Sequence, residues 1–300
     1  MATKTRAEIA VIGGSGLYEM EGLKRVRPVQ VRTPFGKPSD TVILGELAGK
    51  RLAFLSRHGK GHRLNPSAIN YRANLYALKS LGVGRIISVS AVGSMKEQIK
   101  PGHIVLPDQF IDRTRHRQGT FFDQGLVAHV AMADPICPDL SSKLYRAAKQ
   151  VEASVHVGGT YVCIEGPQFS TKAESYLYRS WGVDVIGMTN MPEAKLAREA
   201  EMCYATIALA TDYDCWHKSE ESVTVEAILR IMHHNVLLAK QVIRDVLEQP
   251  LESRSCACAS ALTNAIVTSP DAISTATRRR YQPLLTRMFP PSRKRSQSNG

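Results

Sequence analysis

Short apolar runs and helical patterns alternate along the chain. Four runs rich in β-branched or small apolar residues are each followed by glycine or polar residues, which is typical of a strand that ends in a loop. They are Ile9–Ile12, Ile86–Val89, Val183–Met188 and Ala205–Thr211. Apolar residues recur at helical spacing between and after them, in Asn70–Leu81, Leu140–Val151, Thr171–Trp181, Pro192–Glu201 and Val225–Leu247. The alternation predicts an α/β fold with a central mixed or parallel sheet flanked by helices.

The loops after the four strands are the expected place for chemistry, because ligands of open α/β sheets bind beyond the carboxyl ends of the strands. The first loop, Gly13-Gly14-Ser15-Gly16, can direct backbone N–H groups and a hydroxyl at an anion such as phosphate. It is not a dinucleotide fingerprint, because Glu19 stands where a third glycine is needed, and no Walker lysine follows. An ordinary tight turn explains the same residues.

Two further strand ends carry groups that suit an anion. Arg57 and His58 follow the apolar run Leu52–Leu55, and arginine with histidine can bind phosphate; a surface ion pair beside a solvated histidine is the alternative. Ser90 and Ala91 would add a hydroxyl and a backbone amide.

The fourth loop, Asp212-Tyr213-Asp214, places two carboxylates on one face of an extended segment. Two close carboxylates do not both ionise easily, so one pKa rises and a general acid becomes available near neutral pH. A capping or turn role is the alternative, because aspartate is common in loops.

The segment Glu165–Ser170 predicts a turn ahead of a helix, with Ser170 as its N-cap and Glu174 in the first turn. Phe169 is either a core residue, which the pattern alone favours, or a flat face for an aromatic ligand.

Composition narrows the class of protein. The chain has 300 residues, of which 43% are hydrophobic and 22% charged, which excludes a disordered or fibrous protein. It contains no apolar stretch long enough for a membrane span, and Met1–Glu8 lack the apolar run of a secretory signal, so we expect a cytoplasmic protein. The six cysteines are scattered, and we interpret them as reduced thiols.

The motifs taken together resemble the family of purine nucleoside and S-methyl-5'-thioadenosine phosphorylases, from about Glu8 to Leu247. The segments that carry the resemblance, in the family's order, are Gly13–Gly16, Thr33–Gly36, Arg57–Gly59, Asn65-Pro66 with Asn70-Tyr71, Glu165–Phe169, Met188–Glu193 and Asp212–Trp216.

The resemblance implies a nucleoside phosphorylase fold and a homotrimer that cleaves 5'-methylthioadenosine with inorganic phosphate, giving adenine and 5-methylthioribose 1-phosphate. No metal or organic cofactor is implied, since phosphate is a co-substrate. The residues implied at the phosphate site are Ser15, Arg57, His58, Ser90, Ala91 and Thr189. Those implied at the nucleoside are Phe169 and Ser170 at the base, Met188 at the ribose, Val225 and Ile228 at the methylthio group, and His129 from a neighbouring subunit.

The implied chemistry agrees with the carboxylate pair. Phosphorolysis passes through an oxocarbenium-like state, so a proton on the departing purine lowers the barrier. We expect Asp212 to protonate N7 and Asp214 to accept from the 6-amino group. A 6-oxo purine would place an acceptor against that carboxylate.

Three alternatives remain at this point. A sibling phosphorylase for 6-oxopurine nucleosides or methylthioinosine is disfavoured by the two carboxylates, and a hydrolytic nucleosidase by the phosphate-binding groups. A nucleic-acid-binding protein is suggested by the net charge of +12. Half of this excess lies in residues 251–300, and the chain lacks the spacing of a nucleic-acid-binding motif, so we expect neither nucleic acid nor a membrane as partner.

We expect three parts along the chain: a nucleoside phosphorylase domain over 1–250, a helical extension over 251–288 that packs on it, and a disordered basic tail over 289–300. Leu262–Leu285 would form the helical element of the extension, with Ser269-Pro270-Asp271 as a helix start. Cys256 and Cys258 form a Cys-x-Cys pair, for which a redox or stabilising role is the alternative to plain thiols.

Overall fold

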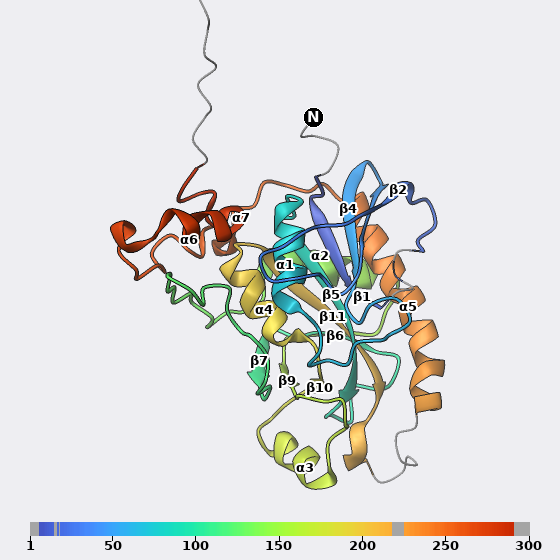
Figure 1. Cartoon of the computed structure of the whole chain (residues 1–300). Helices are drawn as coiled ribbons and strands as arrows, with labels where there is room; N and C mark the ends of the chain where they lie inside the picture. Colours follow the sequence, from blue (N-terminus) through green and yellow to red (C-terminus); the bar gives the residue numbers. More distant parts are fainter. Residues whose placement is uncertain (1–5, 15–16, 18, 218–224, 291–300) are drawn as a thin grey trace, which may run out of the picture.

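The computed structural model describes residues 6–14, 17, 19–217 and 225–290, and the side chains of residues 225–230 lie outside this description. Its centre is one large sheet with helices on both faces (Figure 1). The strands are β1 (Ile9–Gly13), β2 (Lys24–Val29), β3 (Val42–Leu47), β4 (Lys50–Ser56), β5 (Arg85–Ser94), β6 (Ile104–Leu106), β7 (Gln109–Asp112), β8 (Val155–Val157), β9 (Thr160–Cys163), β10 (Val185–Gly187) and β11 (Cys203–Asp212).

The sheet is mixed, and it branches at β5. The main path runs β2-β3-β4-β1-β5-β10-β9-β7, while β11 pairs with β5 and β6, and β6 with β8. Strands β4, β1, β5 and β11 run parallel to one another, whereas β10 is antiparallel to β5. The branch brings the carboxyl ends of the parallel strands to one edge, next to the end of β10.

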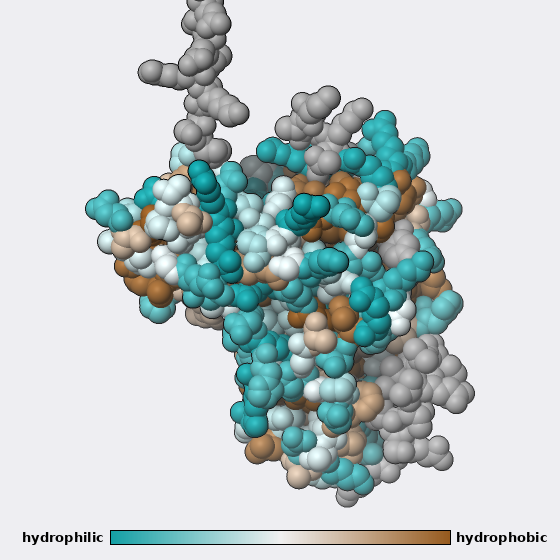
Figure 2. Space-filling model, viewed as in Figure 1, coloured by the Kyte–Doolittle hydropathy of each residue, from teal (hydrophilic) through white to brown (hydrophobic). Residues whose placement is uncertain are grey.

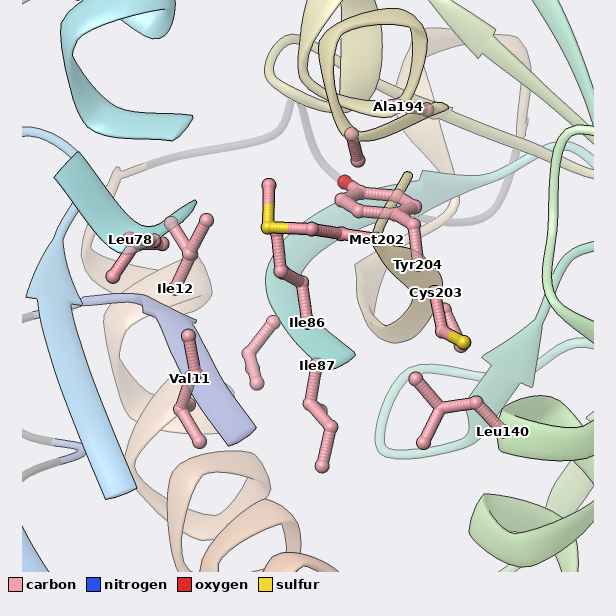
Figure 3. Close-up of a cluster of buried hydrophobic side chains, with 14 of the residues drawn as sticks. Val11, Ile12, Leu78, Ile86, Ile87, Leu140, Ala194, Met202, Cys203 and Tyr204 are labelled. Carbon is pink, nitrogen blue, oxygen red and sulfur yellow. The ribbon is translucent and has the colours of Figure 1, made fainter. Parts of the chain in front are cut away.

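Helices cover the sheet on both sides. The α-helices are α1 (Tyr71–Ser80), α2 (Pro138–Gln150), α3 (Lys172–Ser180), α4 (Asn190–Glu199), α5 (Val225–Glu248), α6 (Thr275–Arg280) and α7 (Gln282–Leu285). Single 3₁₀ turns are η2 (Asp214–Trp216), η3 (Ala257–Ser260) and η4 (Pro270–Ala272). Helices α1 and α4 contact each other on one face, and α2 and α5 on the opposite face (Figures 1 and 3).

The core lies on both faces of β1, β5 and β11. All five residues of β1 and nine of the ten of β11 are buried, which explains why both strands are apolar along their length instead of alternating. Figure 3 shows Val11, Ile86 and Ile87 of these strands between α1 or α4 above and α5 below. The predicted α/β class with a central mixed sheet flanked by helices is confirmed.

Most predicted elements are present with ends that differ by a few residues, but two expectations were wrong. The N-cap of α3 is Thr171, because Thr171 and Glu174 form a reciprocal capping box that requires a spacing of three residues. Ser170 therefore lies outside the helix. Residues Leu262–Leu285 do not form a helical element throughout: Pro270–Ala272 is a single turn, and α6 and α7 are short.

The exposed surface of the view in Figure 2 is largely hydrophilic, with hydrophobic residues in separate groups. Within the part of the chain that the structure describes, no helix is both long and apolar enough to cross a membrane. The expected division at residues 250 and 288 stays a prediction, and most of the expected tail, residues 291–300, falls outside the described residues.

Candidate active site

A cavity of about 690 Å³ lies beyond the carboxyl ends of the parallel strands and of β10. It brings together residues from all four loops that the sequence singles out. The predicted site residues that line it are Arg57, His58, Ser90, Ala91, Phe169, Ser170, Met188, Thr189, Asp212 and Asp214.

Four predicted site residues are not placed in this cavity. Ser15 and the side chains of Val225 and Ile228 lie outside the described residues. His129 is described, but its backbone pairs with Ala265 and it does not line the cavity of its own chain. Its expected role from a neighbouring subunit therefore stays a prediction.

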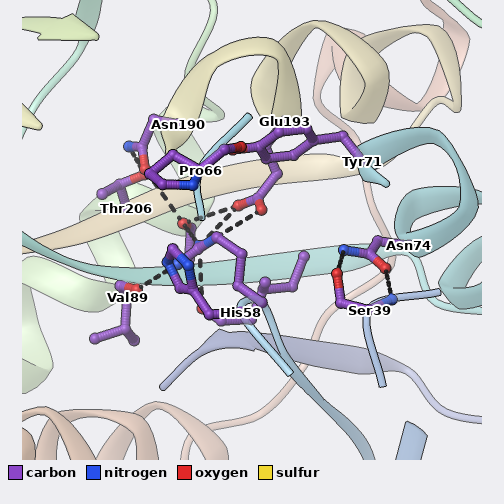
Figure 4. Close-up of polar contacts among 12 residues, drawn as sticks. Ser39, His58, Pro66, Tyr71, Asn74, Val89, Asn190, Glu193 and Thr206 are labelled. Carbon is purple, nitrogen blue, oxygen red and sulfur yellow. Dashed lines mark hydrogen bonds and ion pairs between the residues drawn. The ribbon is translucent and has the colours of Figure 1, made fainter. Parts of the chain in front are cut away.

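Arg57 is buried, with 2% of its surface exposed, and most of its N–H groups bind the protein itself. Its Nε and Nη2 atoms donate to Glu193 at 2.8 and 2.9 Å, and Nη1 donates to the carbonyl of Val89 at 2.9 Å. Figure 4 shows the Glu193 carboxylate and the Val89 carbonyl in this network. Burial alone would lower the pKa of Arg57, but the Glu193 charge more than reverses this, so the guanidinium stays charged. It can therefore offer an anion a fixed charge and one remaining Nη1–H group, but not a bidentate pair.

His58 is neutral in the unliganded protein. Burial lowers the pKa of His58 to about 4, and the Arg57 and His62 charges act in the same direction. Its Nδ1 lies 2.8 Å from the Leu64 carbonyl, which can only accept, so Nδ1 carries the ring proton and Nε2 is an acceptor. His58 can therefore accept from a P–OH group, and it can donate to phosphate only after it takes up a proton.

Two serines that line this cavity have hydroxyls without a hydrogen-bond partner in the described part of the protein. Ser90 Oγ and Ser170 Oγ are buried, and neither makes a hydrogen bond to any residue that the structure describes. Thr189 precedes α4 but does not cap it with its side chain, although it is buried at the same edge. Because unsatisfied buried hydroxyls are costly, they indicate positions where a ligand supplies the missing partner.

The two aspartates lie at the end of β11 and at the start of η2, and they differ in environment. Asp212 accepts from the Thr211 hydroxyl at 2.7 Å and from the backbone N–H of Asp214 at 2.8 Å. Asp214 is 9% exposed and accepts from the Ser175 hydroxyl. Burial raises the pKa of Asp214, the Asp212 charge raises it further, and the Ser175 hydrogen bond opposes both. The two carboxylates are close enough for the Asp212 charge to act on Asp214, and the pKa of Asp214 is raised.

Gly93 of β5 allows the two carboxylates to approach the sheet. A Cβ atom at this position would lie 3.0 Å from Asp212 Oδ1 and 3.3 Å from Asp214 Cβ. Asp214 itself has a positive φ of 53°, a conformation that aspartate tolerates better than most residues. The carboxylates are thus held by backbone geometry as well as by hydrogen bonds.

The loop before α3 supplies the remaining groups. Phe169 is 55% exposed and lines the cavity, so it is not a core residue as its pattern alone favours. Gly166 has a φ of 64°, and a Cβ there would lie 2.5 Å from Met188 Sδ, so glycine lets this loop close on Met188.

Sequence reasoning missed three positions that shape the site. Arg117 is almost fully buried and its Nη atoms donate to the carbonyls of Glu165 at 2.6 Å, Met188 at 2.6 Å and Met191 at 2.7 Å. It joins the loop after β9 to the loop after β10, and no local pattern distinguishes it from the neighbouring arginines. Met232 and Val236 of α5 add apolar surface to the cavity, which helical spacing on α5 could have suggested.

Comparisons with known proteins identify the family of this chain. A family model described as Phosphorylase superfamily matches residues 8–248. S-methyl-5'-thioadenosine phosphorylase of Geobacter sulfurreducens is 63% identical over 273 residues, which is 91% of this chain and 96% of that protein. The protein of the same name from Koribacter versatilis is 53% identical over 95% of this chain and 97% of its own length.

Solved structures point to the same family. A methylthioadenosine phosphorylase from an antarctic soil metagenomic library has a TM-score of 0.88 and 52% identity, and covers 94% of this chain and 100% of its own. A mutant adenosine/methylthioadenosine phosphorylase from Schistosoma mansoni in complex with adenine has a TM-score of 0.77 and 38% identity, over 81% and 91% of the chains. This chain therefore belongs to the S-methyl-5'-thioadenosine phosphorylase family of the phosphorylase superfamily.

Proposed function

We propose that this protein catalyses phosphorolysis of S-methyl-5'-thioadenosine to adenine and 5-methylthioribose 1-phosphate. The observation that carries the proposal is a single cavity that contains both groups suited to phosphate and a carboxylate pair. The two sets of groups lie at different heights along β5, because Asp212 pairs with Gly93 of that strand and Ser90 precedes Gly93. Gly93 lies next to Asp212 and Asp214. Ser90 precedes it by three residues on β5, which is roughly 10 Å on an extended strand. This spacing suits a ribosyl group between phosphate and base.

In the proposed reaction, a phosphate oxygen attacks C1' of the ribosyl group while the C1'–N9 bond breaks. The electron pair of that bond passes to the purine, and the carboxylate pair delivers a proton to N7, so adenine leaves as a neutral base. The fixed charge of Arg57 and the hydroxyls of Ser90 and Thr189 orient the phosphate. Holding both reactants in one cavity removes much of the entropic part of the barrier.

We assign Asp212 as the residue that donates a proton to N7 of the purine. Asp214 would accept a hydrogen bond from the 6-amino group. Burial raises the pKa of Asp214, so Asp214 is harder to ionise than an exposed aspartate. The assignment therefore requires that the 6-amino group, by donating to Asp214, favours its ionised form and shifts the proton toward Asp212.

The methylthio group would lie against the apolar residues of α5. Met232 and Val236 line the cavity and offer no hydrogen bond that a 5'-hydroxyl would need. We expect Val225 and Ile228 to extend this surface. Methylthioadenosine should consequently have a higher kcat/KM than adenosine.

The proposal is tested by base release from methylthioadenosine, adenosine, inosine and methylthioinosine, each with and without phosphate. We expect adenine release from methylthioadenosine only when phosphate is present, with 5-methylthioribose 1-phosphate as the second product. Release at an equal rate without phosphate would instead indicate a hydrolase, and equal use of methylthioinosine would contradict the role of Asp214.

A variant tests the proton donor separately. Asp212→Asn removes the acid but keeps its shape, so kcat should fall at least 100-fold while KM for methylthioadenosine changes little. The matched control is Asp139→Asn, an exposed position in the first turn of α2. A kcat near that of the unaltered protein would exclude Asp212 as the donor.

We further infer a homotrimer that needs no cofactor in its cavity and works in the cytoplasm. A subunit interface is supported by apolar residues exposed on and beside α3, namely Tyr176, Leu177 and Trp181, close to the base-binding loop. Light scattering measures the mass, and cell fractionation the location. His129→Ala should raise KM for methylthioadenosine if His129 contacts a neighbour's nucleoside.

A further inference from the structure

Four of the six cysteines converge at one point outside the active-site cavity. The Sγ atoms of Cys137, Cys203, Cys256 and Cys258 all lie within 4.8 Å of one another. None of the four is among the described residues that line the cavity. We propose that these four thiols form a structural tetrathiolate site for one Zn²⁺ ion.

The four cysteines come from three separate parts of the chain. Cys137 is the N-cap of α2, Cys203 is the first residue of β11, and Cys256 and Cys258 lie at the start and inside of η3. In the sequence only the last two are neighbours, so the group exists only in the folded protein. Cys203 appears in Figure 3 in the core near the sheet, with Leu140 of α2 drawn beside it.

The distances suit one tetrahedral ion. With Zn–S bonds of about 2.3 Å, the sulfurs of a tetrahedral site lie about 3.8 Å apart. The Cys203 and Cys256 sulfurs are 3.3 Å apart, and no pair exceeds 4.8 Å, so small adjustments give the required geometry. Two disulfides would instead need two pairs at about 2.05 Å, and all four cysteines have free thiols here.

The surroundings favour thiolates. Cys137 stands at the N-terminus of a 13-residue helix, where the dipole stabilises negative charge. This position therefore favours a thiolate at Cys137, and each thiol that binds the ion loses its proton to solvent.

Hydrogen bonds already connect the segments that carry the four cysteines. The Cys137 N–H donates to the Tyr204 carbonyl at 2.9 Å, which joins α2 to β11. Arg254 donates to the carbonyl of Glu201 at 2.6 Å, and Leu262 N–H donates to the Glu201 carboxylate at 3.0 Å. The ion would thus fasten the segment after α5 to the amino end of β11, whose carboxyl end carries Asp212.

The test is the metal content of the full-length protein, purified under reductant from zinc-supplemented medium. We expect one zinc per chain by mass spectrometry of the metal. After exchange, Co²⁺ should give intense thiolate charge-transfer bands and the visible bands of a tetrahedral site.

Variants locate the ion. The double variant C256S/C258S should lose zinc and the cobalt bands, and hydrogen exchange in residues 250–289 should speed up at least tenfold. The control C163A removes a buried cysteine outside the group and should keep one zinc. Zinc-free protein with four titratable thiols, or intact mass spectra showing two disulfides in this group, would overturn the proposal.

Discussion

At the scale of residues, environment assigns different properties to side chains of the same type. Arg57 is buried and paired with Glu193, whereas Arg115 is exposed. Asp212 accepts two hydrogen bonds from its own loop, whereas burial raises the pKa of Asp214. The motif contains both aspartates, but it does not say which one holds a proton more tightly, because that depends on burial.

The Asp214→Asn variant tests the basis of base selection. An amide can donate to a 6-oxo group, so discrimination between methylthioadenosine and methylthioinosine should shrink at least tenfold, measured as the ratio of their kcat/KM values. Asp139→Asn should leave this ratio unchanged. An unaltered ratio in Asp214→Asn would show that another group selects the base.

At the scale of elements, the site depends on loops that contact one another through the protein. Glycines at positions 93 and 166 permit the close approaches, and Arg117 joins the loops after β9 and β10 through three carbonyl groups. The main helices follow from their periodicity, and β1 and β11 follow from continuous apolar runs. Strands β2, β3 and β6–β9 were missed; four of them, β6–β9, have only three or four residues, and β2 is largely exposed.

Arg117→Lys should disturb this connection without removing a charge. A single ammonium cannot reach all three carbonyls, so the melting temperature should fall by several degrees and KM for methylthioadenosine should rise about tenfold, with a smaller change in kcat. Arg115→Lys, two residues away and exposed, is the control. A lower kcat at constant KM would argue against a positioning role.

At the scale of the whole molecule, several arginines in the described part of the basic C-terminal segment contact their own protein. Arg280 lies over the Phe35 and Tyr281 rings, Arg278 over the Phe289 ring, and Arg287 pairs with Glu201. Tyr281 also donates to Asp123 at 3.0 Å. Three of the arginines in the segment whose charge suggested a nucleic acid therefore make contacts within the protein.

Stability should depend on pH through Glu199, which accepts from the Thr120 hydroxyl and the Phe121 N–H. Burial raises the pKa of Glu199 from 4.5 to about 7. Between pH 4.5 and 7, Glu199 is protonated in the folded protein but ionised in the unfolded chain. Its contribution to stability is therefore present at low pH and is lost as the pH rises from 4.5 through 7.

The Glu199→Gln variant isolates this contribution. Glutamine does not titrate, so the variant should gain stability relative to the unaltered protein as the pH rises from 4.5 to 7. The difference between their free energies of unfolding should change by up to about 3 kcal/mol over this range. Urea titrations at several pH values measure it, and a difference that does not vary with pH would exclude the effect.

The sequence by itself determined the α/β class, the four strand-end loops and the residue types gathered there, because periodicity and motif order are local properties. Only the tertiary structure decided that Arg57 offers one N–H group, that His58 is neutral, and that Ser90 and Ser170 keep unsatisfied hydroxyls. It also brought four distant cysteines together. These properties depend on burial and on contacts between residues far apart in the chain, which local pattern does not encode.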